Sequence, residues 1–188
     1  MRIISGKAKG KKIQIPIDKK TRPLKDMVRE SIFNIIQHSN LLSSGFDELI
    51  ILDLFSGVGS FGLEAISRGA KKVIFFEDYN PALKMLYQNI DNLGFRGKTE
   101  IYKKNIYHEK AFKQLKYKFD IIFLDPPFKD EKINEILNYI NQENIYHENS
   151  LIIFHSHKRS NIKLFKRFNI IREEIYGSSK IIFGCFIF

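Results

Sequence analysis

The sequence predicts an α/β fold, in which helices cover both faces of a doubly wound, mostly parallel sheet. Between residues 50 and 155, short apolar runs alternate with stretches of helical periodicity. Two of these runs, 50–54 and 120–124, end abruptly in polar residues. A continuous apolar run is typical of a strand that is buried on both faces, and in such sheets ligands bind at the carboxyl ends of the strands. The last apolar stretches, 169–176 and 180–188, flank a Gly-Ser-Ser turn, which indicates an antiparallel hairpin.

Length and composition fit one domain with a small appendage. The chain has 188 residues, 44% of them apolar, and its 17 Phe residues are sufficient for a full core. The only cysteine, Cys185, excludes an intramolecular disulfide and is typical of a reducing compartment. Nothing near Arg2 resembles a secretory signal, and the apolar run 181–188 is too short to span a bilayer. We therefore expect a soluble, cytoplasmic monomer without membrane contact.

The net charge of +10 is unevenly distributed. Residues 1–30 contain ten Lys or Arg residues and three acids, a local charge of +7. Clustered positive charge favours a polyanionic partner such as nucleic acid. The alternative is a Lys-rich composition that makes every surface basic without a specific partner. A second basic cluster comprises Lys158, Arg159, Lys163, Lys166, Arg167 and Arg172.

The first 45 residues are predicted to form a basic extension that precedes a main domain at 46–188. Two short strands, 2–5 and 11–15, are joined by a basic Gly-rich turn. After a break at Thr21-Arg22-Pro23, apolar residues at helical spacing predict a helix over 24–38.

The main domain is predicted to alternate strands and helices before the terminal hairpin. Pro81, a residue favoured in the first turn of a helix, marks the start of the second helix. The pattern for the third helix is the weakest of the four. The expected strands are 50–54, 72–77, 98–104, 120–124 and 150–155, and the expected helices are 61–68, 81–93, 110–115 and 132–141.

A glycine-rich loop follows the first strand of this domain. Residues 57–62 fit the GxGxxG pattern, and Glu77 ends the next strand, 20 residues after Gly57. The same pattern binds dinucleotides, whose pyrophosphate the loop and helix N-terminus hold. Asp53, at the end of the preceding strand, would repel that anion. S-adenosylmethionine carries an ammonium and a sulfonium and no phosphate, so Asp53 favours it over a nucleotide cofactor or a ligand-free turn.

Two polar residues at neighbouring strand ends extend this predicted cofactor site. The Glu77 carboxylate can accept hydrogen bonds from both ribose hydroxyls. Asn105 follows the third strand, where a side-chain amide could bind the adenine edge. An ordinary turn residue explains Asn105 equally well.

The second polar strand end is Asp125-Pro126-Pro127-Phe128. Two consecutive prolines make a rigid loop, because each fixes its own φ and pushes its predecessor into an extended conformation. Asp125 and the Pro126 carbonyl can then accept hydrogen bonds from one NH2 group, and Phe128 offers a face on which a base can stack. The alternative is a purely structural proline turn.

This tip suits the methylation of an exocyclic amine on a nucleic-acid base. Such an amine is a poor nucleophile because its lone pair is delocalised into the ring. Two acceptors that hold its hydrogens out of the ring plane localise the lone pair and offset the positive charge that develops on nitrogen. Positioning and electrostatics then supply most of the rate.

At these residues the sequence resembles the class I S-adenosylmethionine-dependent methyltransferases, and more closely the RsmD-type family of 16S ribosomal RNA guanine-N2 methyltransferases. The resemblance covers nearly the whole chain. The glycine loop and the Asp-Pro-Pro-Phe tip resemble amino-group methyltransferases, and the N-terminal segments narrow the resemblance to this family. It is carried by Arg2-Ile3-Ile4-Ser5-Gly6, Lys9-Gly10-Lys11-Lys12-Ile13, Thr21-Arg22-Pro23, Val28-Arg29-Glu30-Ser31-Ile32-Phe33-Asn34, Asp53-Leu54-Phe55-Ser56-Gly57-Val58-Gly59, Gly62-Leu63-Glu64-Ala65 and Asp125-Pro126-Pro127-Phe128.

The resemblance implies a Rossmann-like, seven-stranded sheet with an antiparallel last strand, S-adenosylmethionine as cofactor, and a guanine of 16S rRNA in the 30S subunit or an assembly intermediate as substrate. It implies a catalytic tip of Asp125, Pro126, Pro127 and Phe128. The cofactor-binding residues expected are Asp53, Phe55, Ser56, Gly57, Gly59, Glu77, Asp78, Asn105 and Ile106. The RNA-binding residues expected are Arg2, Lys9, Lys11, Lys12, Arg22 and Arg29. For Arg22 and Arg29, closure of the cofactor pocket or a salt bridge to Glu30 or Asp26 are alternatives.

Three positions depart from the family pattern. Tyr79 and His155 stand where relatives often carry acids, and Asn105-Ile106 stands where Asp-Ala is common. An adenine-N6 methyltransferase acting on RNA or DNA and a non-catalytic RNA-binding module on the same fold are competing interpretations. DNA enzymes of the first kind usually need a sizeable target-recognition domain, for which only about 45 residues are spare. The five His residues lack the spacing of a metal site.

Overall fold

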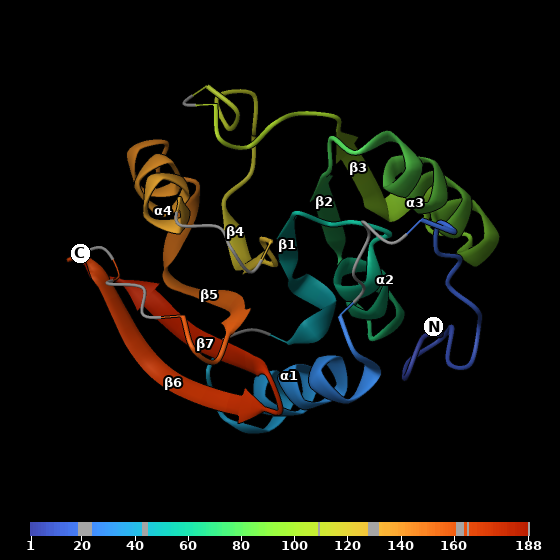
Figure 1. Ribbon diagram of the computed structural model, residues 1–188, viewed down its shortest axis with the longest axis horizontal. Coiled ribbons are helices and arrows are strands. Elements are labelled where there is room, and N and C mark those ends of the chain that lie inside the picture. Colours follow the sequence, from blue (N-terminus) through green and yellow to red (C-terminus); the bar gives the residue numbers. More distant parts are fainter. Residues whose placement is uncertain are drawn as a thin grey trace.

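A seven-stranded sheet forms the centre of the protein (Figure 1). The computed structural model describes residues 1–18, 24–42, 45–108, 110–127, 132–160, 164 and 166–187. The strands are β1 (Ile50–Leu54), β2 (Lys72–Phe76), β3 (Thr99–Tyr102), β4 (Phe119–Leu124), β5 (Tyr146–His157), β6 (Phe168–Tyr176) and β7 (Ser179–Phe186). Their order in the sheet is β3-β2-β1-β4-β5-β7-β6. Strand β7 is antiparallel to β5 and β6, and the other neighbouring pairs are parallel, which confirms the predicted fold class.

The helices divide between the two faces of the sheet. They are α1 (Asp26–His38), α2 (Ser60–Ser67), α3 (Asn80–Leu93) and α4 (Ile133–Gln142), with short 3-10 turns at Phe46–Glu48 and Arg96–Lys98. Residues of α1, α2 and α3 share one hydrophobic cluster, and residues of α4 belong to a second. In Figure 1, α2 and α3 lie together, away from α4. No helix in the described part of the chain is long and apolar enough to cross a membrane.

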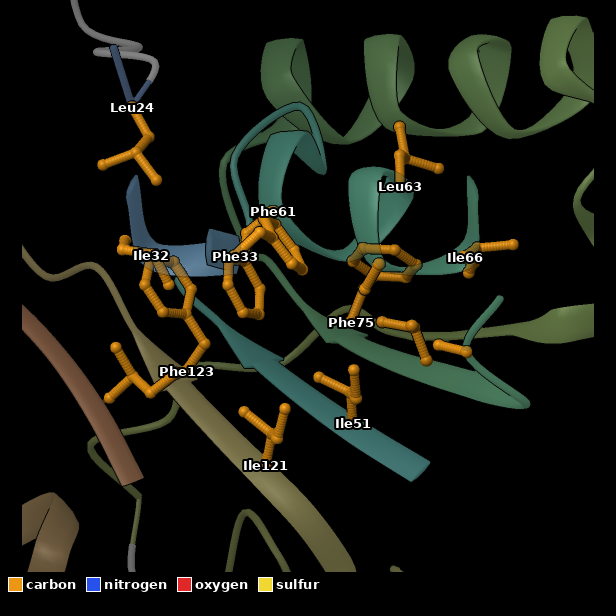
Figure 2. Packing of buried hydrophobic residues seen from close by; sticks show 14 of the residues in the cluster. Leu24, Ile32, Phe33, Ile51, Phe61, Leu63, Ile66, Phe75, Ile121 and Phe123 are labelled. Carbon is orange, nitrogen blue, oxygen red and sulfur yellow. The ribbon is translucent and has the colours of Figure 1, made fainter. Parts of the chain in front are cut away.

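Stacked aromatic rings connect α1 to the central strands. Phe33 of α1 stacks on Phe61 of α2 with ring centroids 4.9 Å apart, and Phe61 stacks on Phe123 of β4 at 3.9 Å. Figure 2 shows these rings close together, beside Ile51 and Ile121 of neighbouring strands. Phe123 lies two residues before Asp125, so the stack helps to position the strand that carries the Asp-Pro-Pro segment.

The N-terminal segment packs on α2 and α3 through hydrogen bonds as well as apolar contacts. Ile3, Ala8 and Ile13 are buried in the same cluster as α1 to α3. The buried Glu64 carboxylate accepts hydrogen bonds from the backbone N–H groups of Ile4 and Ser5, at 2.7 and 2.9 Å.

Two predicted elements differ from the structure. The hairpin over 2–15 is only partly regular: one antiparallel bridge between Arg2 and Lys12 and three backbone hydrogen bonds join its two arms. Other backbone groups of the segment bind side chains of α2 and α3 instead. The predicted helix at 110–115 is wrong: its residues form turns, although Ala111 and Phe112 are buried as a helix face would be.

Candidate active site

The polar ends of β1 and β4 lie side by side at the carboxyl edge of the sheet. Leu54 pairs with Leu124 in the parallel register. The Asp125 N–H then donates to the Leu54 carbonyl at 3.3 Å, which ties the start of the Asp-Pro-Pro tip to the start of the glycine loop. The two motifs that the sequence analysis singled out therefore form one site.

The loop after β1 reaches α2 through backbone conformations with positive φ. Phe55, Gly57 and Gly59 have φ values of 57°, 55° and 82°. Gly59 precedes the first residue of α2, and a Cβ placed on it would lie 2.4 Å from a methyl group of Leu86. Only glycine satisfies both requirements at this position. The buried Ser56 hydroxyl accepts the Phe76 N–H at 3.0 Å, which joins the loop to β2.

Asp53 is buried, with 1% of its surface exposed, and its Oδ2 accepts the Gly62 N–H in the first turn of α2 at 3.0 Å. Burial raises the pKa of this carboxyl group well above its ordinary value, and the hydrogen bond from Gly62 lowers it in part. The nearby carboxylates of Asp125 and Glu77 raise the pKa further. The site thus holds a concentration of negative charge that a cationic ligand would relieve.

Glu77 connects the glycine loop to the end of β2. Its Oε2 accepts the Gly57 N–H and its Oε1 accepts the Tyr79 N–H, both at 2.7 Å. Burial raises the pKa of Glu77, and these two backbone hydrogen bonds oppose the shift. Each carboxylate oxygen keeps a second lone pair for a ligand.

A pocket of about 270 Å³ opens between the ends of β1, β2 and β3. This volume includes open solvent at the mouth of the pocket, so the pocket is a shallow hollow at the ends of these strands. Five residues expected to bind the cofactor line it, and the Phe55 and Tyr107 rings lie 5.6 Å apart on its wall. The sequence analysis missed Phe76, Lys104 and Tyr107. The full lining is Phe55, Phe76, Glu77, Asp78, Lys104, Asn105, Ile106 and Tyr107.

The side chain of Asn105 has a local hydrogen bond. Its Oδ1 accepts the Tyr107 N–H at 2.9 Å, as in an ordinary turn. This hydrogen bond uses only Oδ1, so Nδ2 of the exposed Asn105 can still donate to a ligand. The turn and the ligand-binding interpretations are therefore compatible.

At the end of β4, Asp125 is bound by a residue that the sequence analysis left without a role. Nδ1 of His155, near the end of β5, lies 2.7 Å from Oδ1 of Asp125. His155 is 6% exposed. Pro126 is buried and Pro127 is exposed, whereas Phe128 lies outside the described residues.

The basic residues expected to contact RNA fall into three groups. Arg2, Lys9, Lys11 and Lys12 are exposed. Arg22 lies outside the described residues. The prediction for Arg29 is wrong as a surface contact: its side chain is fully buried, binds Asp26 at 3.0 Å and donates to the Arg2 carbonyl at 2.5 Å. The alternative, a salt bridge to Asp26, is the one observed.

Among the described residues, no group of three or more His, Cys, Asp or Glu side chains could hold a metal ion. The acids of the site are instead bound by backbone N–H groups and by His155.

Comparisons with known proteins agree with this architecture. YlbH of Bacillus subtilis is 33% identical over 156 residues, which cover 81% of this chain and 80% of that protein. Ribosomal RNA small subunit methyltransferase D of Haemophilus influenzae is 29% identical over 182 residues, 94% of this chain and 89% of the relative. The solved structure of yhhF from Escherichia coli is 25% identical, covers 100% of this chain and 98% of its own, and has a TM-score of 0.82.

The sheet order and the match to a solved methyltransferase structure identify the Rossmann-like fold of methyltransferases. The model of the family described as Conserved hypothetical protein 95 matches residues 1–185. The chain belongs to this family, the RsmD family of methyltransferases.

Proposed function

We propose that this protein transfers a methyl group from S-adenosylmethionine to the exocyclic N2 of a guanine in 16S rRNA, within the 30S subunit or an assembly intermediate. One observation carries the proposal: the buried acid and glycine loop of β1 lie directly beside the Asp125-Pro126-Pro127 tip of β4. A cofactor at the first and an amine at the second would be in contact.

The residues of the site fit S-adenosylmethionine. The buried carboxylate of Asp53, whose pKa is raised by burial and neighbouring acids, suits a ligand with an ammonium and a sulfonium. Glu77 retains lone pairs toward the pocket for the ribose hydroxyls, and Phe55 and Ile106 supply apolar walls for the adenine. When bound, S-adenosylmethionine supplies an electrophilic methyl group.

The tip residues are proposed to activate the amine. Asp125 accepts one hydrogen of the NH2 group and the Pro126 carbonyl accepts the other, which holds both out of the ring plane. The nitrogen lone pair is then directed at the methyl group, and the two acceptors stabilise the charge that develops on nitrogen. Asp125 takes the proton that nitrogen releases after the new bond has formed. Phe128 is proposed as the stacking surface for the base.

The family supports ribosomal RNA as the substrate class. Two relatives from Haemophilus influenzae and Escherichia coli carry the name ribosomal RNA small subunit methyltransferase D. The exposed cations Arg2, Lys9, Lys11 and Lys12 are proposed to contact RNA phosphates. Adenine N6 is the alternative target, because the same two acceptors would hold any planar exocyclic amine.

Replacement of Asp125 tests the catalytic assignment. We expect Asp125→Ala to abolish methyl transfer and to leave the affinity for S-adenosylmethionine within a few-fold, measured by calorimetry. Asp120→Ala is the matched control, since Asp120 lies on the same strand and binds the Ile50 N–H at the opposite edge of the sheet, 2.7 Å away. Equal losses of binding and transfer in Asp125→Ala would contradict the assignment.

A further inference from the structure

We infer that His155 is a positioning residue for the methyl-transfer site: it holds the Asp125 carboxylate through its Nδ1–H and so presents the second carboxylate oxygen to the amine. The inference rests on the proposed function and deepens it. Its basis is the 2.7 Å contact between Nδ1 of His155, which lies in β5, and Oδ1 of Asp125, which directly follows β4.

The sheet register places the two side chains beside each other. In the parallel pair, Leu124 of β4 is opposite Phe154 of β5, so Asp125 and His155 occupy the next row. Alternate residues of a strand point to the same face. Asp125 therefore shares a face with Phe123, and His155 shares that face with Ile153; both of these apolar residues belong to the cluster of α1 to α3.

The packing around the pair restricts its geometry. The His155 side chain is 7% exposed and the Asp125 side chain 19% exposed. On its other side, His155 is paired with Ile181 of the antiparallel β7. A carboxylate only accepts hydrogen bonds, so an ionised Asp125 requires the proton on Nδ1 of the imidazole. This fixes the histidine tautomer and the rotation of the carboxylate together.

A fixed carboxylate matters because the amine must meet its acceptor in one orientation. If the Asp125 carboxylate rotated freely, its oxygens would adopt several orientations. Few of these orientations would hold an amine hydrogen out of the ring plane. With Oδ1 bound to His155, the direction of Oδ2 is set before the substrate arrives. His155 acts through Asp125 and makes no contact with the reacting atoms in this arrangement.

Three substitutions at position 155 separate this role from a structural one. The Nδ2 of asparagine occupies the place of the imidazole Nδ1, so His155→Asn keeps the donor. Glutamine carries its amide one bond further out, and leucine has no donor. We expect His155→Leu and His155→Gln to lower kcat by about 10- to 100-fold, the effect of losing an orienting partner. His155→Asn should stay within about threefold, and KM for S-adenosylmethionine should change little in all three.

A spectroscopic measurement tests the contact without any methyl transfer. The protein has five His residues, so the imidazole nitrogens can be assigned by ¹⁵N NMR of the labelled chain. We expect His155 to be protonated on Nδ1 at neutral pH, and Asp125→Ala to shift its nitrogen signals while the melting temperature stays comparable. This result stands even if the wild-type protein methylates a substrate other than guanine.

Three outcomes would overturn the inference. The first is a neutral His155 with its proton on Nε2 and no response to Asp125→Ala. The second is wild-type kcat in His155→Leu. The third is equal impairment of His155→Asn and His155→Leu in step with their melting temperatures, which would show that packing and not the donor is needed.

Discussion

At the scale of single residues, the buried carboxylate of Asp53 has a structural cost that its proposed role in cofactor binding would offset. Its carboxylate is buried beside two other acids, where burial and like charges disfavour ionisation. The Gly62 N–H is its only hydrogen-bond donor among the contacts found in the described residues. The proposed cationic cofactor would supply the missing counter-charge.

Replacement of this carboxylate by an amide should stabilise the free protein and weaken cofactor binding. Because the folded pKa of Asp53 is raised above the unfolded value of about 3.9, its protonated form is favoured by folding, and that contribution is lost as the pH rises through the folded pKa. Asp53→Asn forms no charge and can still accept from Gly62. We expect its melting temperature to exceed that of wild type by a margin that grows above pH 4.

The measurement is a series of thermal melts from pH 4 to pH 8 without cofactor, together with calorimetric titration of S-adenosylmethionine. The affinity of Asp53→Asn should fall by about 10- to 100-fold, as for loss of a charged contact. A margin that does not vary with pH would show that the pKa of Asp53 is not raised in the folded protein. An unchanged affinity would show that Asp53 is not the cation-binding group.

At the scale of elements, one side chain of α3 links the N-terminal segment to the glycine loop. Asn89 is fully buried. Its Oδ1 accepts the Gln14 N–H at 2.7 Å, and its Nδ2 donates to the carbonyls of Gln14 at 3.0 Å and Val58 at 3.2 Å. The segment that carries Lys11 and Lys12 is thereby held against the loop of the cofactor site.

Loss of the Asn89 amide should destabilise the N-terminal segment and the glycine loop, which it joins. Asn89→Leu keeps the volume and leaves three backbone groups without their hydrogen bonds, so we expect the free energy of unfolding to fall by about 1–3 kcal/mol. Backbone amides of residues 1–18 should exchange faster with deuterium. Asn92→Leu, at an exposed position on the same helix, is the control and should change neither quantity. Unchanged exchange in Asn89→Leu would mean that apolar contacts alone hold the segment.

At the scale of the whole molecule, the fold separates the basic residues between two edges of the sheet. Lys158 and Arg159 follow the carboxyl end of β5, at the same edge of the sheet as Asp125, and both are exposed. Lys166 and Arg167 precede β6, which is parallel to β5, so they lie at the opposite edge. The turn of Lys7 also lies away from the tip, since its N–H donates to Ser67 at the last residue of α2. We therefore expect an RNA whose target base enters the proposed site to contact Lys158 and Arg159 more than Lys166 and Arg167.

A pair of double variants tests this arrangement at equal change in charge. We expect Lys158→Ala with Arg159→Ala to weaken RNA binding and to reduce the slope of log K against log salt by up to about 2. Lys166→Ala with Arg167→Ala should have a smaller effect on both. The two slopes are measured by filter binding to 16S rRNA at salt concentrations from about 50 to 200 mM. Equal effects of the two pairs would favour a general surface charge without a defined path.

The sheet was predictable because its strands are continuous apolar runs, and β1 and β4 lie within one residue of their expected bounds. The irregular N-terminal segment was not, because Glu64 and Asn89, which bind its backbone, lie 60 and 75 residues away in the sequence. The burial of Arg29 depends on its packing near Glu64 of another helix, although its nearby partner Asp26 was among the predicted alternatives. Five pocket residues were expected from strand ends and from the family resemblance, whereas Phe76, Lys104 and Tyr107 were not. The contact between Asp125 and His155 depends on the register of β4 against β5, which no local pattern in either strand specifies.

The most direct test of the account is tritium transfer from labelled S-adenosylmethionine to 30S subunits isolated from cells that lack this gene, followed by nucleoside analysis of the RNA. Deproteinised 16S rRNA serves as the parallel substrate and Asp125→Ala as the inactive control. The account predicts N2-methylguanosine as the labelled product. N6-methyladenosine would contradict the proposed target while keeping the role of the tip, and cofactor binding without transfer to either substrate would contradict the proposed function itself.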